Sequence, residues 1–138
     1  MKFFRYIFLM KFNSLIPELS VSSIEASKDF YVNKLGFKIE YERKEDKFIY
    51  ISFEGNQIML QEINNNWSVG LLEYPFGRGI NFEMIVSNID KLYNKVKASN
   101  ITFFKDLMIS NYRKDNKTIV QKEFLIQDPD GYLLRFCD

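Results

Sequence analysis

The sequence contains no histidine in its 138 residues and only one cysteine, Cys137. Without histidine, the chain cannot build a Ser-His-Asp or Cys-His catalytic arrangement, and it lacks the commonest side-chain ligand of transition metals. A single cysteine cannot form an intrachain disulfide, and scarce cysteine is typical of proteins from reducing compartments. We therefore expect a cytoplasmic protein.

A strong net charge and a long apolar run are also missing. Nineteen basic and eighteen acidic side chains give a net charge of +1, so no bulk field attracts nucleic acid or an anionic membrane. The N-terminal apolar run Ile7–Met10 is much shorter than the core of a secretion signal or a transmembrane helix. We expect neither nucleic acid nor membrane as a partner. The alternation of apolar residues from Phe4 to Phe12 predicts that residues 1–14 form an N-terminal arm or an extra strand.

Residues 15–138 have ordinary globular composition, which predicts a single domain, and they contain two similar halves. Residues 18–25 (ELSVSSIE) match residues 83–90 (EMIVSNID). In each copy a short apolar strand ends in Ser or Asn residues that are suited to capping a helix. The first helix is expected to begin at Ile24 and to end at Gly36, because glycine favours the conformation that terminates helices.

Three strand-like runs follow each expected helix, so each half has the order βαβββ. The fold class is therefore predicted to be α+β, with modules at about residues 15–63 and 80–138 joined by a polar linker at 64–79. The expected strands after the helices are Phe37–Glu42, Phe48–Phe53 and Gln57–Ile63 in the first half, and Ile101–Ser110, Thr118–Gln127 and Tyr132–Cys137 in the second.

Five short segments carry a resemblance to a known family: IPELSV at 16–21, DFY at 29–31, KLGF at 34–37, EF at 123–124 and DPDGYLLRF at 128–136. Together with the duplicated βαβββ order, they resemble the vicinal oxygen chelate superfamily of glyoxalases, bleomycin resistance proteins and dioxygenases. The resemblance implies that the two modules form a curved mixed sheet with a concave ligand cleft. It covers several activities and does not choose among them.

The resemblance also implies where metal-using relatives place their ligands. Carried onto this sequence, the first-strand positions are Ile16 and Asn81, and the late-strand positions are Met59 and Arg135. Isoleucine and methionine are poor ligands for hard or borderline divalent ions, and arginine brings a positive charge to the place of the cation. We therefore expect no metal and no other cofactor.

Strand alternation predicts which side chains line the cleft. The second strand would add Glu40 and Glu42 at its rim, and the polar linker would add an exposed Trp67. Arg135 is expected either to pair with Glu18 or Glu83 inside the cleft or to lie at a solvated sheet end. Carboxylates among aromatic rings favour a cationic, partly flat ligand. The predicted ligand-binding residues are Glu18, Phe48, Tyr50, Met59, Gln61, Trp67, Asn81, Glu83 and Arg135.

Two classes of function remain open. In the first, the protein is a metal-free homodimer that sequesters a drug or metabolite, as the resemblance to bleomycin resistance proteins implies. The net charge of +1, and Ile119 where many of those proteins carry tryptophan, depart from that pattern. In the second class it is a glyoxalase-like lyase or another enzyme of the superfamily. The missing metal ligands favour the binding protein, and we predict no catalytic residue.

Overall fold

The computed structural model describes residues 11–138, so most of the predicted N-terminal arm lies outside the described residues. The first module forms a four-stranded sheet in the order β1-β4-β3-β2, in which only β1 and β4 are parallel. Its elements are β1 (Glu18–Val21), α2 (Ile24–Lys28), the π-helical η1 (Asp29–Leu35), β2 (Lys38–Arg43), the 3-10 turn η2 (Lys44–Asp46), β3 (Phe48–Phe53) and β4 (Asn56–Glu62).

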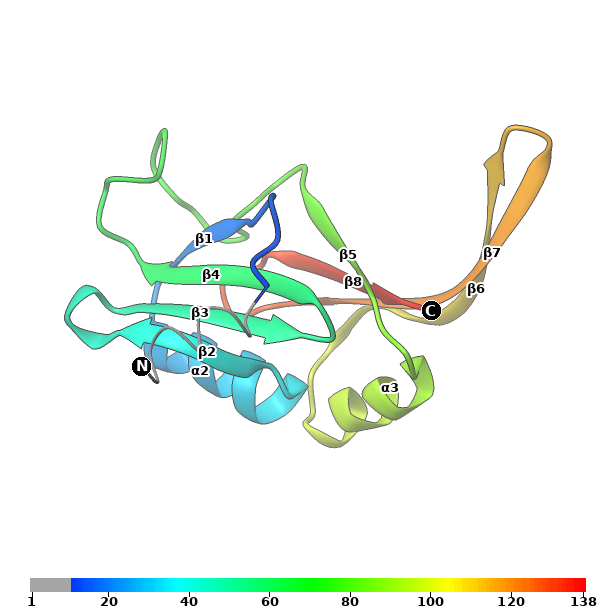
Figure 1. Cartoon of the computed structure of the whole chain (residues 1–138), viewed down its shortest axis with the longest axis horizontal. Helices are drawn as coiled ribbons and strands as arrows, with labels where there is room; N and C mark the ends of the chain where they lie inside the picture. Colours follow the sequence, from blue (N-terminus) through cyan, green and yellow to red (C-terminus); the bar gives the residue numbers. More distant parts are fainter. Residues whose placement is uncertain (1–10) are drawn as a thin grey trace.

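The second module repeats this topology as a sheet in the order β5-β8-β7-β6, with β5 and β8 parallel. The two sheets and their helices confirm the predicted α+β fold of tandem βαβββ modules. The elements of this module are β5 (Asn81–Ile85), α3 (Ile89–Ala98), β6 (Phe103–Lys114), β7 (Lys117–Gln127) and β8 (Leu133–Cys137). Strands β6 and β7 extend well past the other strands and project from the body as a long hairpin (Figure 1).

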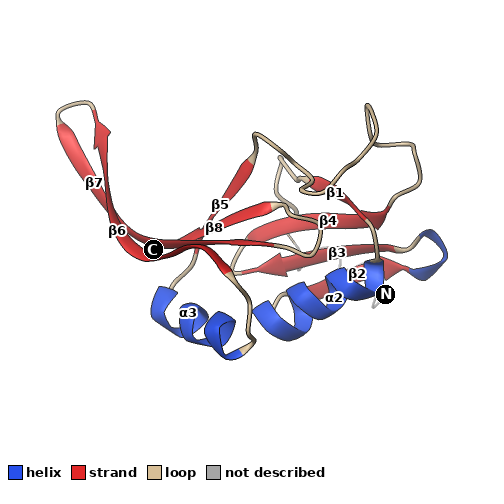
Figure 2. Ribbon diagram, turned by 180° about the vertical axis from the view of Figure 1, so that it is seen from behind, coloured by secondary structure: helices blue, strands red, loops and turns tan. Residues whose placement is uncertain are grey.

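Local signals in the sequence set the helix ends. The Ser23 hydroxyl accepts a hydrogen bond from the Ala26 amide at the start of α2, and Asn88 accepts one from the Lys91 amide at the start of α3. Gly36 ends η1 with a φ of 95°, in the left-handed region where a side chain is strained. Both helical segments lie on the same side of the two sheets (Figure 2). The opposite sheet faces are therefore the concave faces on which the ligand cleft is predicted.

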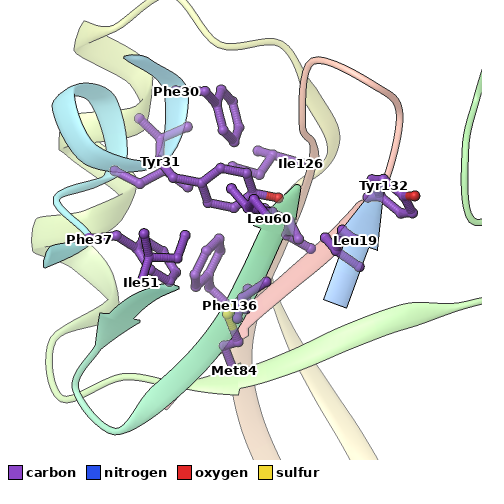
Figure 3. Packing of buried hydrophobic residues seen from close by; sticks show 14 of the residues in the cluster. Leu19, Phe30, Tyr31, Phe37, Ile51, Leu60, Met84, Ile126, Tyr132 and Phe136 are labelled. Atoms are coloured by element: carbon purple, nitrogen blue, oxygen red, sulfur yellow. The ribbon is translucent and has the colours of Figure 1, made fainter. Parts of the chain in front are cut away.

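The hydrophobic core lies between the helices and the sheets. Leu19 and Val21 on β1 are buried, whereas Glu18 and Ser20, which alternate with them, are partly exposed, as strand alternation predicts. Figure 3 shows the Tyr31 ring of η1 packed among side chains of both modules. The two sheets therefore share one core.

The segment Asp128–Gly131 joins the modules. The Tyr31 hydroxyl donates a 2.7 Å hydrogen bond to Asp128, and the Ser22 amide donates one of 3.1 Å to the Asp130 carboxylate. The Asp130 carbonyl accepts a bond from the amide of Phe76 in the linker. This motif, which carried part of the family resemblance, thus connects the first module, the linker and the second module.

Candidate functional site

The aromatic residues predicted for the first half of the cleft form a closed layer. Phe48 and Tyr50 lie on the concave side of β3, but they are only 2% and 1% exposed. The Tyr50 ring stacks on Tyr41 and meets the edge of Phe12, with centroids 5.2 Å apart in both pairs. The Arg43 guanidinium lies 3.9 Å from the centre of the Phe48 ring. A ligand on this face would meet these covering residues before it met Phe48 or Tyr50.

Residues 11–13 are hydrogen-bonded to the β3–β4 hairpin. Gln57 donates a 2.7 Å bond to the Lys11 carbonyl and accepts a 2.8 Å bond from the Asn13 amide. The Asn13 side chain donates to the Gly55 carbonyl. These bonds hold the Phe12 ring over Tyr50, and this contact explains part of the burial of Tyr50.

The remaining first-module candidates lie on β1, β4 and the linker. Glu18 is paired in register with Met59, and partial burial raises the pKa of Glu18, while the charge of Arg43 acts in the opposite direction. The Trp67 indole is 67% exposed, as predicted, and donates a 3.0 Å hydrogen bond to Gln61. Glu18, Met59, Gln61 and Trp67 thus belong to the first module's half of the concave surface.

The expectation that Glu42 lies at the cleft rim is wrong. A register shift at Glu40 makes Tyr41 pair with Tyr50 and Glu42 pair with Ile49, so that Glu42 turns to the helix side of the sheet. There it forms a 2.9 Å ion pair with Lys28 of α2. Glu40 stays on the concave side, where it accepts a hydrogen bond from Ser52.

The second module carries a concave pocket of about 480 Å³ with Arg135 in its wall. The guanidinium donates a 3.2 Å hydrogen bond to Asn81 and lies 3.7 Å from the Glu83 carboxylate. It also lies 3.8 Å from the carboxylate of Glu123. Of the two partners that the sequence left open for Arg135, the structure pairs it with Glu83 on the neighbouring strand.

Glu123 is the most buried of the polar pocket residues that the sequence did not predict, which also include Lys105, Ser110 and Tyr112. Its side chain is on the same face as Arg135 because β7 and β8 pair Leu125 with Arg135 and Glu123 with Cys137. It is only 1% exposed, and the Tyr112 hydroxyl donates a short hydrogen bond to one of its oxygens. Alternation along the predicted strand 118–127 would have placed Glu123 on the cleft side, opposite the core residue Phe124.

The predicted ligand-binding residues fall into two groups. Asn81, Glu83 and Arg135 come together in the second module, whereas the six from the first module lie on the other sheet or in the linker. The pocket that contains Asn81 and Arg135 is lined entirely by second-module residues. Each module of one chain therefore presents its own part of the concave surface.

Two βαβββ modules, each with helical segments on one side of its sheet and a concave surface on the other, define a class of two-module α+β proteins. The model of the Glyoxalase/Bleomycin resistance protein/Dioxygenase superfamily matches residues 11–136. The chain belongs to this superfamily. The comparison with curated proteins found no match.

Several solved structures are similar to the chain. A superfamily member from Vibrio splendidus 12B01 is 37% identical, with 88% of this chain and 95% of that chain covered and a TM-score of 0.40. A superfamily protein from Alicyclobacillus acidocaldarius is 26% identical, with coverage of 91% and 89% and a TM-score of 0.65. TioX from Micromonospora sp. ML1 shares the fold at 15% identity, with coverage of 91% and 98% and a TM-score of 0.71.

The residues at the metal positions implied by the superfamily do not fit a divalent cation. Ile16 offers no donor atom, Met59 offers only a thioether, and the Arg135 guanidinium is hydrogen-bonded to the fourth residue, Asn81. Within residues 11–138 there is no group of three or more His, Cys, Asp or Glu side chains arranged to hold a metal ion. The donor set thus disagrees with the metal site found in part of the superfamily.

Proposed function

We propose that the protein binds a small cationic, partly flat molecule without using a metal. The observation that carries this proposal is the ion-pair network of Arg135 with Glu83 and Glu123, at a position where metal-using relatives hold a ligand. Arg135 and the two carboxylates together leave one negative charge. Lys105 also lines the pocket, but it is exposed, so solvent screens its charge. A positively charged ligand suits that balance.

The size and lining of the second-module pocket support a small-molecule ligand. Its volume of about 480 Å³ lies in the usual range for such sites. Leu125, Leu133 and Met108 give it an apolar wall, while the 54% exposed Phe104 and the partly exposed Tyr112 supply aromatic surface. Flat organic cations bind well to surfaces that combine aromatic rings and carboxylates.

The finer proposal is a bleomycin-resistance type of binding in a cytoplasmic homodimer. The superfamily's name includes bleomycin resistance proteins, and the polar concave surface is divided between two sheets in one chain. A second copy that brings its first module opposite the second module of its partner would enclose the ligand. Trp67 and Arg135 would then contribute to the same cleft from different chains.

Titration of the full-length protein with bleomycin and with a panel of flat aromatic cations tests this proposal. Trp67 is the only tryptophan, so binding near it should quench the protein fluorescence saturably. The Trp67→Ala variant should bind about 1–3 kcal/mol more weakly by calorimetry while its melting temperature stays nearly unchanged. Leu71→Ala is the matched control, because Leu71 is a 96% exposed residue of the same linker.

The outcomes separate the binding protein from the alternatives. Saturable binding of a cation with no gain in melting temperature from Zn²⁺, Ni²⁺, Fe²⁺ or Mn²⁺ supports the proposal. One tightly held transition-metal ion per purified chain, with metal-stimulated lactoylglutathione lyase activity, would move the protein to the enzyme class. Failure of every cation in the panel to bind would refute the proposed function.

A further inference from the structure

Glu123 has one carboxylate oxygen that no group in residues 11–138 satisfies by hydrogen bonding. The other oxygen, Oε1, accepts the bond from the Tyr112 hydroxyl, whereas Oε2 is buried without a donor. The nearest cation is the Arg135 guanidinium at 3.8 Å, which is longer than a hydrogen bond. Oε2 therefore lies near a positive charge but accepts no hydrogen bond from the described residues.

A buried carboxylate oxygen in this state is costly. A buried acceptor without a hydrogen-bond partner destabilises the folded state, and more so when it is charged. The Ser27 hydroxyl of α2 is also buried without a partner within the described residues, but it is not part of the pocket lining. Glu123, by contrast, lines the concave pocket of the second module.

We propose that Glu123 Oε2 is the anchoring acceptor for the ligand, and that the ligand donates to it from a protonated nitrogen. Tyr112 fixes the carboxylate through Oε1, and Arg135 is already engaged by Asn81 and Glu83. The anchoring group is an amidinium or guanidinium, because a planar donor fits a carboxylate and can stack on the ring of Phe104 at the rim. This inference rests on the proposed function and deepens it by naming the anchoring atom and the ligand's donor group.

The charges around the pocket agree with a cationic donor. The second module brings Glu83 and Glu123 against Arg135, while Lys105 lies exposed at the rim, where solvent screens its charge. An anionic ligand would have to approach a buried carboxylate that has no donor of its own. A neutral amide would supply a weaker hydrogen bond than a charged one.

Three aromatic probes of similar shape test the inference: benzamidine (cation), benzamide (neutral) and benzoate (anion). Binding to the full-length protein is followed by the chemical shifts of backbone amides in two-dimensional ¹H–¹⁵N spectra. Benzamidine should shift the amides of β7 and β8 around Glu123 and Arg135, and it should bind at least about tenfold more tightly than benzamide. Benzoate should leave these amides unchanged.

Two variants separate the anchoring role from a structural one. Glu123→Gln should weaken benzamidine binding about tenfold or more. Glu83→Gln should weaken it less than about threefold, because Glu83 is 39% exposed and already accepts a hydrogen bond from Gln121. Tyr112→Phe keeps the ring and frees Oε1, so benzamidine should bind at least as tightly as to the wild type through two acceptor oxygens. If Glu123→Gln does not fold, the Tyr112→Phe result and the three-probe comparison still decide the question.

The failure of this inference can be told apart from the failure of the proposed function. Equal binding of benzamidine and benzamide in the pocket, or unchanged benzamidine affinity in folded Glu123→Gln, overturns the anchoring role of Glu123 and leaves small-molecule binding standing. Weaker benzamidine binding by Tyr112→Phe also counts against it. If none of the three probes shifts the pocket amides and no cation of the earlier panel binds, both proposals fall.

Discussion

Asp128, a turn residue of the family motif, is buried in the core, and its pKa is shifted there. Burial raises its pKa from 3.8 to about 6, although hydrogen bonds from Tyr31 and from the amides of Tyr132 and Asp130 act in the opposite direction. Between pH 3.8 and about pH 6, Asp128 binds more protons in the folded protein than in the unfolded chain. Its contribution to stability is therefore fully present below about pH 4 and is lost as the pH rises through about 6.

We expect Asp128→Asn to remove this pH dependence. The free energy of unfolding of the wild type relative to the variant should fall by about 3 kcal/mol between about pH 4 and pH 7, because each pKa unit corresponds to about 1.4 kcal/mol. Urea unfolding at a series of pH values measures it. In Tyr31→Phe, which lacks one bond that lowers this pKa, the fall should move to higher pH. A difference between wild type and Asp128→Asn that stays constant with pH would contradict this explanation.

The sequence predicts the exposure and the partners of some site residues but not of others. The exposure of Trp67 follows from the composition of the linker, which is a local property. Strand alternation left Glu18, Glu83 and a solvated sheet end open for Arg135, and the structure pairs it with Glu83. The burial of Phe48 and Tyr50 depends on Tyr41, Arg43 and Phe12, which come from other segments. Alternation predicts the face of a residue, but the packing of other segments decides its depth.

At the scale of elements, a single extra residue changes which side chains the second strand presents. The register shift at Glu40 turns Tyr41 to the concave face and Glu42 to the helices. The sequence predicts strict alternation through Phe37–Glu42, because nothing in the composition of this run marks the bulge. Cross-strand packing of Tyr41 on Tyr50 accompanies the shift.

The turn Asp128–Gly131 should be far less tolerant of substitution than the turn between β3 and β4. Gly131 has a φ of 94°, and an added Cβ would lie 2.5 Å from the Pro75 Cβ and 2.6 Å from its Cα. Gly131→Ala should therefore destabilise the protein by about 3 kcal/mol, through a strained backbone and a clash with the linker.

Gly55→Ala is the matched control for this prediction. Gly55 also has a positive φ, of 85°, but an added Cβ meets no heavy atom within 4 Å. Its substitution should cost about 1 kcal/mol from backbone strain alone. Equal losses of melting temperature in the two variants would show that the contact between Gly131 and Pro75 contributes little.

At the scale of the whole molecule, the outer part of the β6–β7 hairpin is largely exposed to solvent. Ile109 and Val120 lie on one face of this hairpin and are 62% and 60% exposed. The hairpin projects away from the body in both views (Figures 1 and 2). This face continues the helix side of the sheet, because Lys122, the cross-strand partner of Ile109, forms an ion pair with Asp90 of α3. A second copy of the chain that covers this face would bury both apolar side chains on the side opposite the pocket. Among the helices of residues 11–138, none has the length and hydropathy to span a membrane.

Sedimentation velocity should give a particle of about 33 kDa, twice the chain mass of 16.5 kDa. Replacing both Ile109 and Val120 with Lys should shift the protein to monomer, because burying two unpaired charges in an interface is costly. Val69→Lys is the control, since Val69 is a fully exposed apolar residue of the linker. A wild-type protein that stays monomeric at high concentration would refute the homodimer.

The sequence by itself determined the order of elements, the duplicated βαβββ pattern, the helix ends at Ser23, Asn88 and Gly36, and the face that most strand residues occupy. These properties depend on neighbours along the chain, through capping, backbone conformation and the two-residue period of a strand. Only the tertiary structure decided the turn of Glu42 toward Lys28, the cover over Tyr50 and the burial of Glu123 beside Arg135. Each of these depends on which distant segment packs against the residue, and burial and pairing are set by that packing.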